Sequence, residues 1–282
     1  LSISDGRHPV IEVLREGNYI PNSLQLDNKQ RQLMILTGPN MGGKSTYMRQ
    51  TALISVMAQS GCFVPASSAR LGMVDRVFTR VGAHDDLVHG HSTFMVEMLE
   101  LANILRNATP NSLVLLDEIG RGTSTFDGLA LAWAVAEQLH AGKGVKTLFA
   151  THYHQLTDVS KILDKSVNCH MQAKEDGHEL TLMHRVAEGP TDASFGIHVA
   201  KMAGVPEEVL ERARKVLNNL EEGSTIEVSK AGPVQSVFST DFGGRTETKQ
   251  NPVVDEIKKM DLMNLTPLQA LEKLHEIQQK LL

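Results

Sequence analysis

The most specific chemistry in the sequence belongs to a glycine-rich segment that ends in lysine, serine and threonine. It fits the pattern G-x-x-x-x-G-K-[ST], extended by one residue, and consists of Gly38, Pro39, Asn40, Met41, Gly42, Gly43, Lys44, Ser45 and Thr46. Its glycines let backbone N–H groups curl around phosphate oxygens, and a helix that follows points its positive end at the same anion. We expect Lys44 to reach the β- and γ-phosphates and the Ser45 hydroxyl to bind Mg²⁺. The alternative is a glycine-rich turn that matches the pattern by chance.

A pair of adjacent acidic residues, Asp117 and Glu118, directly follows the apolar run 113–116. This is the carboxyl end of an expected buried strand, where open α/β sheets bind their ligands. We expect Asp117 to hold Mg²⁺, directly or through water, and Glu118 to orient and deprotonate an attacking water. Adjacent acids are common on protein surfaces, but downstream of a phosphate-binding loop they predict an ATPase.

These residues need a sheet to position them. Apolar or alternating runs predict strands, and helical spacing predicts helices. The expected strands are 34–37, 76–81, 113–116 and 147–150, and the expected helices are 45–60, 91–105 and 129–140. Because strands alternate with helices, we predict an α/β fold with a mostly parallel sheet that is covered on both faces.

The remainder of the chain divides by composition. Asp176 and Gly177 lie between two alternating runs and predict a hairpin, and two helices split at 204–206 follow. Gly, Ser, Thr, Lys and Gln then dominate a stretch that predicts a flexible linker, before an apolar helical pattern returns. The expected organisation is an ATPase domain at 1–195, a helix-turn-helix at 196–222, a linker at 223–252 and a helical hairpin for oligomerisation at 253–282.

Composition excludes several classes of protein. With 282 residues and 41% hydrophobic content the chain is neither disordered nor fibrous, and it has no apolar stretch of the ~20 residues that span a bilayer. With a net charge of −5 the chain lacks the clustered positive charge that we expect of a domain that binds DNA by itself. Cys62 and Cys169 match no metal-binding spacing and fit a reducing interior. The chain begins with Leu1 instead of Met, so we expect a fragment of a longer protein.

Four blocks of this sequence, in the expected order, resemble the ATPase domain of the MutS family of DNA mismatch repair proteins. They are residues 37–46 (TGPNMGGKST), 92–98 (STFMVEM), 117–128 (DEIGRGTSTFDG) and 151–152 (TH). The likeness covers residues 1 to about 222, and residues 265–271 resemble the C-terminal end of bacterial members. It implies the P-loop NTPase fold of the ABC-ATPase type, with ATP and Mg²⁺ as cofactors.

The resemblance also implies roles that the residues alone leave open. Ser92 would reach the γ-phosphate held by a second subunit, whereas by itself it is a good helix N-cap. His152 would sense the γ-phosphate, although a lone histidine at a strand end is more often structural, and Asp127 would line the dimer contact. Tyr19 and Ile20 fall where the family packs adenine, with core packing as the alternative.

Partners follow from the same likeness. The family forms a homodimer through the ATPase domains, aided by the helix-turn-helix, and we expect a tetramer through the tail. Mismatched DNA would be bound by domains of the parent protein, with MutL as a partner. Residues 235–238 (QSVF) faintly resemble a sliding-clamp peptide but depart from its five-residue form. We expect a cytoplasmic, nucleoid-associated protein with no membrane contact.

Other hypotheses remain at this stage. Another ABC-type ATPase of repair or transport would usually carry a Leu-Ser-Gly-Gly signature, from which residues 92–95 (STFM) depart. The chain could instead act mainly as an oligomerisation or partner-binding module, or belong to a branch of the family outside mismatch repair.

Overall fold

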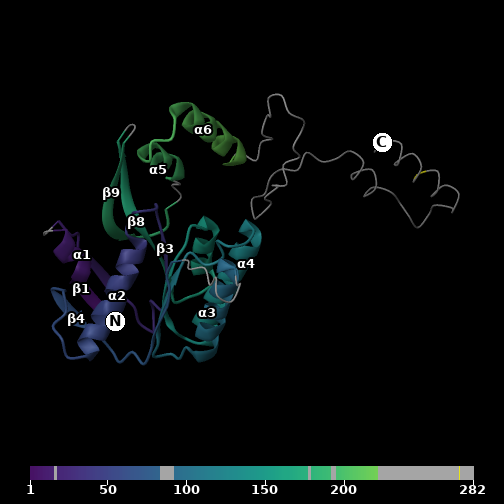
Figure 1. The fold of residues 1–282 in the computed structure, drawn as a ribbon. Coiled ribbons are helices and arrows are strands. Elements are labelled where there is room, and N and C mark those ends of the chain that lie inside the picture. Colours follow the sequence, from purple (N-terminus) through teal and green to yellow (C-terminus); the bar gives the residue numbers. More distant parts are fainter. Residues whose placement is uncertain (16–17, 83–91, 177–178, 192–194, 222–272, 274–282) are drawn as a thin grey trace. The chain divides into compact units, whose positions relative to one another are not determined.

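The computed structural model describes residues 1–15, 18–82, 92–176, 179–191, 195–221 and 273 (Figure 1). The chain divides into two compact units, Leu1–Arg214 and Lys215–Leu282. The elements described below belong to the first unit, apart from the last residues of one helix. The predicted linker, the C-terminal hairpin and the clamp-like segment 235–238 lie outside the described residues, except for Lys273.

A six-stranded sheet forms the centre of the first unit, in the order β5-β6-β7-β3-β8-β9. Neighbouring strands from β5 to β8 are parallel, and β9 pairs antiparallel with β8. The strands are β3 (Leu33–Thr37), β5 (Val77–Arg80), β6 (Leu113–Asp117), β7 (Lys146–Ala150), β8 (Ser166–Asp176) and β9 (Glu179–Glu188). The predicted mostly parallel α/β sheet and the β-hairpin formed by β8 and β9 are therefore confirmed.

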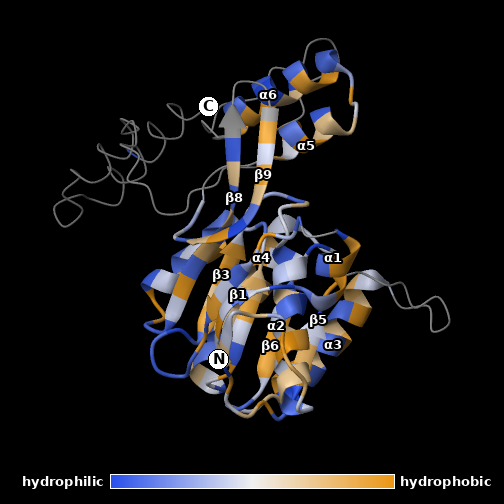
Figure 2. Ribbon diagram, turned by 90° about the vertical axis from the view of Figure 1, so that its left-hand side faces the viewer, coloured by the Kyte–Doolittle hydropathy of each residue, from blue (hydrophilic) through white to orange (hydrophobic). Residues whose placement is uncertain are grey.

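The central strands are apolar on both sides because helices or a second sheet cover both faces. Successive residues of a strand point to opposite faces, and the two cores divide accordingly. One core packs against α3 (Thr93–Asn107) and α4 (Thr125–Glu137) and contains Ile35, Val114, Leu116 and Phe149. The other packs against α2 (Lys44–Gln59) and contains Leu36, Leu115, Leu148 and Ala150. Figure 2 shows the apolar strands β3 and β6 among the helices.

A small antiparallel sheet, in the order β2-β1-β4, occupies the α2 side (Figure 1). It consists of β1 (Ser2–Gly6), β2 (Asn22–Gln25) and β4 (Ser68–Arg70), with the short helix α1 (Pro9–Leu14) between the first two. No strand or helix is predicted for this region from the sequence. These strands have three to five residues, too few for a clear alternation, and they form because Ile3, Leu24 and Leu26 are buried in the α2-side core.

Two helix boundaries differ from the expectation. The helix expected at 129–140 begins at Thr125, because Ser124 caps it and accepts a hydrogen bond from the Asp127 N–H at 3.3 Å. Its last turn is a separate π-helical segment, Gln138–Gly142. The helix expected from 91 begins at Thr93 with Ser92 as its N-cap, so the capping interpretation of Ser92 is confirmed.

Two helices follow the hairpin, as predicted. They are α5 (Gly196–Met202) and α6 (Glu207–Glu221), separated by a turn in which Gly204 has a φ of 85° and Pro206 precedes the first turn of α6. In the part of the chain that the structure describes, no helix is both long enough and apolar enough to cross a membrane.

The two-sided burial of the strands predicts the cost of a core truncation. Leu115 is fully buried in β6, so Leu115→Ala should lower the free energy of unfolding by about 2–5 kcal/mol through lost apolar contact and a residual cavity. The control is Leu99→Ala on α3, whose leucine is 48% exposed. Urea denaturation followed by circular dichroism measures both. Equal losses for the two variants would contradict this assignment of the core.

Candidate active site

The glycine-rich loop connects β3 to α2 at the carboxyl end of the sheet. Gly38 and Gly43 have φ values of 127° and 108°, which favour glycine. A Cβ added at Gly38 would lie 3.0 Å from the Cβ of Met171, so the backbone must pass close to β8. Gly43 is the N-cap of α2 and has no side chain. The N–H groups of the first turn of α2 are therefore open to an anion.

Lys44 lies at the first position of α2 and is buried. Its Nζ donates to the carbonyl oxygens of Gly38 at 2.9 Å and Pro39 at 3.2 Å, so the ammonium points back into its own loop. Burial lowers the pKa of Lys44, and the carboxylates of Glu118 and Asp117 oppose that shift. A desolvated cation held in a ring of backbone dipoles interacts strongly with a phosphate.

Ser45 and Asp117 come together from the two sides of β7. The Ser45 hydroxyl donates to Asp117 Oδ2. Burial raises the pKa of Asp117, although the Ser45 hydrogen bond lowers it. Asp117 Oδ1 is buried and has no hydrogen-bond partner among the described residues. Mg²⁺ in phosphate-binding sites uses one or two protein oxygens together with phosphate oxygens and water, so this oxygen pair fits that ion.

Glu118 is held at both carboxylate oxygens. Its Oε1 lies 2.5 Å from His152 Nε2, and its Oε2 lies 2.5 Å from an Arg121 guanidinium nitrogen. The hydrogen bond from His152 lowers the pKa of Glu118, with the charges of His152 and Arg121 acting in the same direction. Glu118 is thus an ionised carboxylate at neutral pH, and since a carboxylate only accepts, Nε2 of His152 carries a proton.

The sheet order explains why these residues meet. In the order β6-β7-β3 the carboxyl ends of three parallel strands lie side by side. Glu118 follows β6, His152 follows β7 and the loop follows β3. The Lys44 ammonium lies 3.4 Å from His152 Nε2, so the loop approaches the other two strand ends closely, although both atoms carry protons and form no hydrogen bond with each other. The predicted catalytic and metal-binding residues are therefore neighbours.

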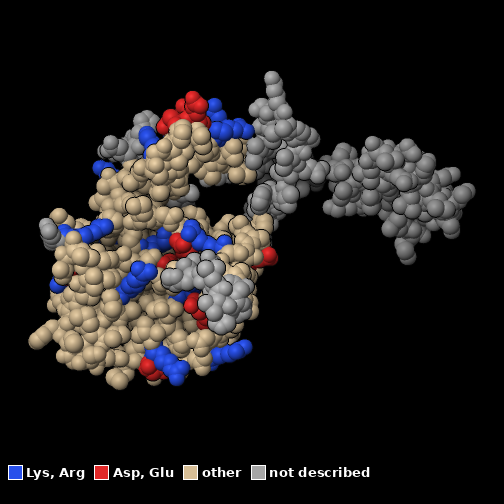
Figure 3. All heavy atoms as spheres, viewed as in Figure 1, with Lys and Arg blue, Asp and Glu red and all other residues tan. Residues whose placement is uncertain are grey.

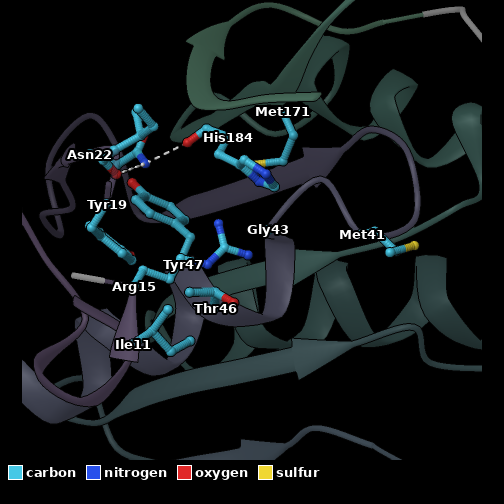
Figure 4. Close-up of a pocket in the computed structure, with 11 residues that line it drawn as sticks. Ile11, Arg15, Tyr19, Asn22, Met41, Gly43, Thr46, Tyr47, Met171 and His184 are labelled. Carbon is cyan, nitrogen blue, oxygen red and sulfur yellow. Dashed lines mark hydrogen bonds between the residues drawn. The ribbon is translucent and has the colours of Figure 1, made fainter. Parts of the chain in front are cut away.

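A second group of predicted residues lies on the other side of the loop. Tyr19 and Ile20 line a pocket together with Gly43, Thr46 and His184 (Figure 4). The Tyr19 hydroxyl donates to Gln50 Oε1 of α2 at 2.8 Å. Tyr19 is half-buried and Ile20 is 37% exposed. Both therefore line the pocket instead of belonging to the described apolar cores.

The far wall of this pocket comes from β9. Asn22, the first residue of β2, donates to the carbonyl oxygen of His184 at 2.9 Å and accepts from the Val186 N–H at 2.7 Å. These two hydrogen bonds connect the start of β2 to β9. His184 Nδ1 lies 3.1 Å from the carbonyl oxygen of Gly42. In Figure 4 His184 lies beside Met171, whereas Met41 stands apart from the other labelled side chains.

Three other residues predicted from the sequence, Ser92, Asn40 and Asp127, have exposed side chains. The Ser92 side chain is exposed and accepts from the Met95 N–H at 3.3 Å. Thr93, next to it, lines a cavity of about 410 Å³ with Ser45, Asp117 and Glu118. Asn40 is exposed at the tip of the loop, and Asp127 is exposed in the first turn of α4.

Three further residues at the candidate site were not predicted from the sequence. Arg121 lies three positions after Glu118, and this spacing of opposite charges is a local signal from which the ion pair could have been predicted. Glu97 accepts a hydrogen bond from the Gly120 N–H at 2.6 Å. His184 gives no local signal, because only the pairing of β9 with β8 brings it to the loop.

A phosphate-binding loop between a strand and a helix, with a Ser–Asp pair and a half-buried glutamate at the end of the strand β6, defines a P-loop nucleotide-binding protein. The model of a known family, MutS domain V, matches residues 34–221. The chain belongs to the MutS family.

Named relatives agree with this assignment. The chain is 52% identical to the DNA mismatch repair protein MutS of Methanosarcina mazei and to that of Methanococcoides burtonii, and 48% identical to that of Caldicellulosiruptor bescii. Each match covers 99% of this chain and 33% of the relative. The chain therefore spans about a third of the length of these relatives.

The partly buried carboxyl group of Asp117 predicts how stability depends on pH. The folded state of an acid with a raised pKa holds its proton up to a higher pH than the unfolded state does. The free energy of unfolding therefore falls as the pH increases from the ordinary pKa through the raised one. Asp117→Asn removes this cost and can still accept from Ser45. It should raise the thermal midpoint of the nucleotide-free chain by a few degrees at pH 7, and the gain should vanish below the ordinary pKa of 3.8.

Thermal denaturation of both proteins across this pH range measures the difference. Asp158→Asn is the control, because Asp158 is an exposed carboxylate that pairs with Lys161 at the surface. A lower midpoint for Asp117→Asn than for the unmodified chain at pH 7 would show that desolvation does not govern this carboxyl group.

Proposed function

We propose that this chain is the ATP-binding and ATP-hydrolysing part of a MutS-type DNA mismatch repair protein, whose nucleotide cycle drives the conformational changes of the parent protein. The observation that carries this proposal is the position of Glu118, an ionised carboxylate fixed between His152 and Arg121 beside the Ser45–Asp117 pair. A base held in this way can orient a water molecule next to a phosphate that lies on the loop.

The reaction would be in-line attack of water on the γ-phosphorus. Glu118 would accept a hydrogen bond from the water and then its proton, while the bond to the leaving oxygen breaks. Lys44 would turn from the carbonyl oxygens of its own loop to the phosphates, and His152 would donate its Nε2 proton to the γ-phosphate instead of to Glu118. Mg²⁺ held by Ser45 and Asp117 would supply positive charge to the phosphate oxygens.

The adenine base would occupy the pocket lined by Tyr19, Ile20 and His184. Three features support this placement. The pocket adjoins Gly43 and Thr46 of the loop, its walls offer a phenol and an imidazole as stacking surfaces, and Asn22 fixes the backbone of β9 beside it. Aromatic stacking tolerates any base, so this pocket would provide affinity more than selectivity.

We further propose that two copies of the chain share each ATP site. Ser92 is exposed at the N-terminus of the long helix α3, where the helix dipole favours an anion. It would bind the γ-phosphate held on the loop of the second copy. Asp127, which is also exposed, would line the contact, and the helices α5 and α6 would extend it. The tail would add tetramer formation.

DNA would be bound mainly by the parts of the parent protein that this chain does not contain. On the surface shown in Figure 3, Lys and Arg lie among Asp and Glu and form no continuous basic patch. With a net charge of −5, such a surface lacks the electrostatic footprint of a DNA-binding domain. MutL and a sliding clamp are proposed partners of the whole protein. Membership of the MutS family argues against another ABC-type ATPase.

Substitution of the proposed base tests hydrolysis and dimer formation together. Glu118→Gln should lower the ATPase rate at least about 100-fold, because the amide cannot accept the proton, while ATP still binds. Sedimentation velocity should then show a larger species with ATP and Mg²⁺ than without them. Adding Ser92→Arg to this variant should abolish the ATP-dependent increase and leave ATP binding intact.

Both variants keep the tail, so any association through the tail is the same with and without ATP. Full ATPase activity in Glu118→Gln would overturn the proposed base. An ATP-dependent increase that survives Ser92→Arg would refute the role of Ser92 in the second subunit.

The proposed adenine pocket makes a separate prediction. Tyr19→Ala should weaken ATP binding about tenfold, because base–aromatic stacking contributes ~1–3 kcal/mol. Tyr19→Phe is the matched control: it retains the ring, loses only the hydrogen bond to Gln50, and should bind ATP nearly as well as the unmodified chain. Calorimetric titration with ATP measures both. Equal losses for alanine and phenylalanine would assign the effect to the hydroxyl and not to stacking.

A further inference from the structure

A buried glutamate on α3 contacts the turn that carries the proposed base. Glu97 is 5% exposed, and its Oε1 accepts a hydrogen bond from the backbone N–H of Gly120 at 2.6 Å. Gly120 lies two positions after Glu118. The contact joins α3 to a turn 23 residues away in the sequence, and neither the phosphate-binding loop nor the Ser45–Asp117 pair takes part in it.

The turn after β6 needs such support because its backbone is strained. Glu118 has a φ of 58°, which is uncommon for a residue with a side chain, and Gly120 has a φ of 89°. The backbone of Gly120 also packs closely against α4: a Cβ at this position would lie 2.6 Å from the Cα of Gly128, too close for any side chain. Strained conformations persist only when their surroundings hold them.

Gly120 is held from two sides. Glu97 accepts from its N–H, and the hydroxyl of Tyr153, the residue after His152, donates to its carbonyl oxygen at 3.0 Å. Close packing adds a second contact with α3, because a Cβ at Gly122 would lie 2.8 Å from the Cβ of Phe94. The first turns of α3 and the turn after Glu118 therefore form one rigid contact.

The second oxygen of Glu97 faces a buried arginine. Oε2 lies 3.6 Å from the guanidinium of Arg80, and both side chains are 7% exposed. Arg80 also lies 3.2 Å from Glu100 and donates to the carbonyl oxygen of Gly82. The ion pair holds the charge of Glu97 in place, so its other oxygen remains an acceptor for Gly120.

We propose that Glu97 is a positioning residue for ATP hydrolysis: by accepting from Gly120 it sets the orientation of Glu118 and couples that orientation to the amino end of α3. Ser92 caps the same helix. A shift of α3 when Ser92 engages the nucleotide of a second copy would thus reach Glu118 of its own subunit. This inference rests on the proposed function of Glu118 and Ser92.

Two double variants isolate the hydrogen bond. Removing Glu97 alone would leave the Arg80 charge buried and poorly paired, which is strongly destabilising. Both variants therefore contain Arg80→Met. Combined with Glu97→Gln, the side chain keeps an oxygen that accepts from Gly120, and combined with Glu97→Leu it keeps none. Glu100→Gln is a further control, because Glu100 pairs with Arg80 and makes no hydrogen bond to Gly120.

The measurement is steady-state ATPase kinetics of the full chain, together with calorimetric titration of ADP. The leucine variant should lose about 10–100-fold in kcat relative to the glutamine variant, the cost expected of a misplaced base. KM for ATP and the affinity for ADP, which depend on the loop and the base pocket, should agree within about twofold. Glu100→Gln should retain the kcat of the unmodified chain.

Equal kcat values for the two double variants would overturn the inference, and so would a parallel loss of ADP affinity, which indicates a general structural role. Should the leucine variant fail to fold, Glu97→Asp replaces it: the charge beside Arg80 remains, but the side chain is one methylene too short for Gly120, and an unchanged kcat would again refute the proposal. If the unmodified chain hydrolyses no ATP, the proposed function itself fails, and this inference falls with it.

Discussion

The structure depends on keeping opposite charges close together at the carboxyl edge of a sheet that is buried on both faces. Lys44 and Asp117 are both largely removed from water, and burial shifts the pKa of each toward its neutral form. The loop carbonyls and the nearby carboxylates partly compensate the charge of Lys44, and the Ser45 hydroxyl partly compensates that of Asp117. Such a cluster is costly for a folded protein, but it presents preorganised charges to a phosphate, which is what phosphoryl transfer requires.

The backbone around this cluster is held in conformations that local preference does not favour. Gly38 and Gly43 on one side and Glu118 and Gly120 on the other have positive φ values. The glycine positions are maintained by close packing against β8 and α4, and the position of Glu118 by hydrogen bonds to its neighbours. α3 takes part in this support while presenting Ser92 at its exposed end. The helix therefore contacts the turn that carries Glu118 and, in the proposed dimer, would also lie at the surface that binds a second copy.

Much of the candidate active site could be predicted from the sequence because its residues occupy short, contiguous motifs. The spacing of Lys44 and Ser45 relative to the glycines, and the position of Asp117 and Glu118 after an apolar run, express local constraints that a P-loop imposes on any fold. Tyr19 was placed at the nucleotide only by family likeness. Glu97 and His184 were not predicted because they contact residues far away in the sequence: Glu97 is 23 positions from Gly120, and His184 contacts Gly42. Arg121 was not predicted although it lies only three positions from Glu118.

The sequence by itself determined the fold class, the phosphate-binding loop, the acidic pair and the order of the main strands and helices, because apolar periodicity and glycine placement are local properties. The tertiary structure alone decided the small N-terminal sheet, whose short strands form only against the α2-side core. It also decided that Glu118 lies between His152 and Arg121 and that Glu97 supports its turn. The physical reason is that strand order brings distant chain ends to one edge of the sheet, and no local pattern encodes that order.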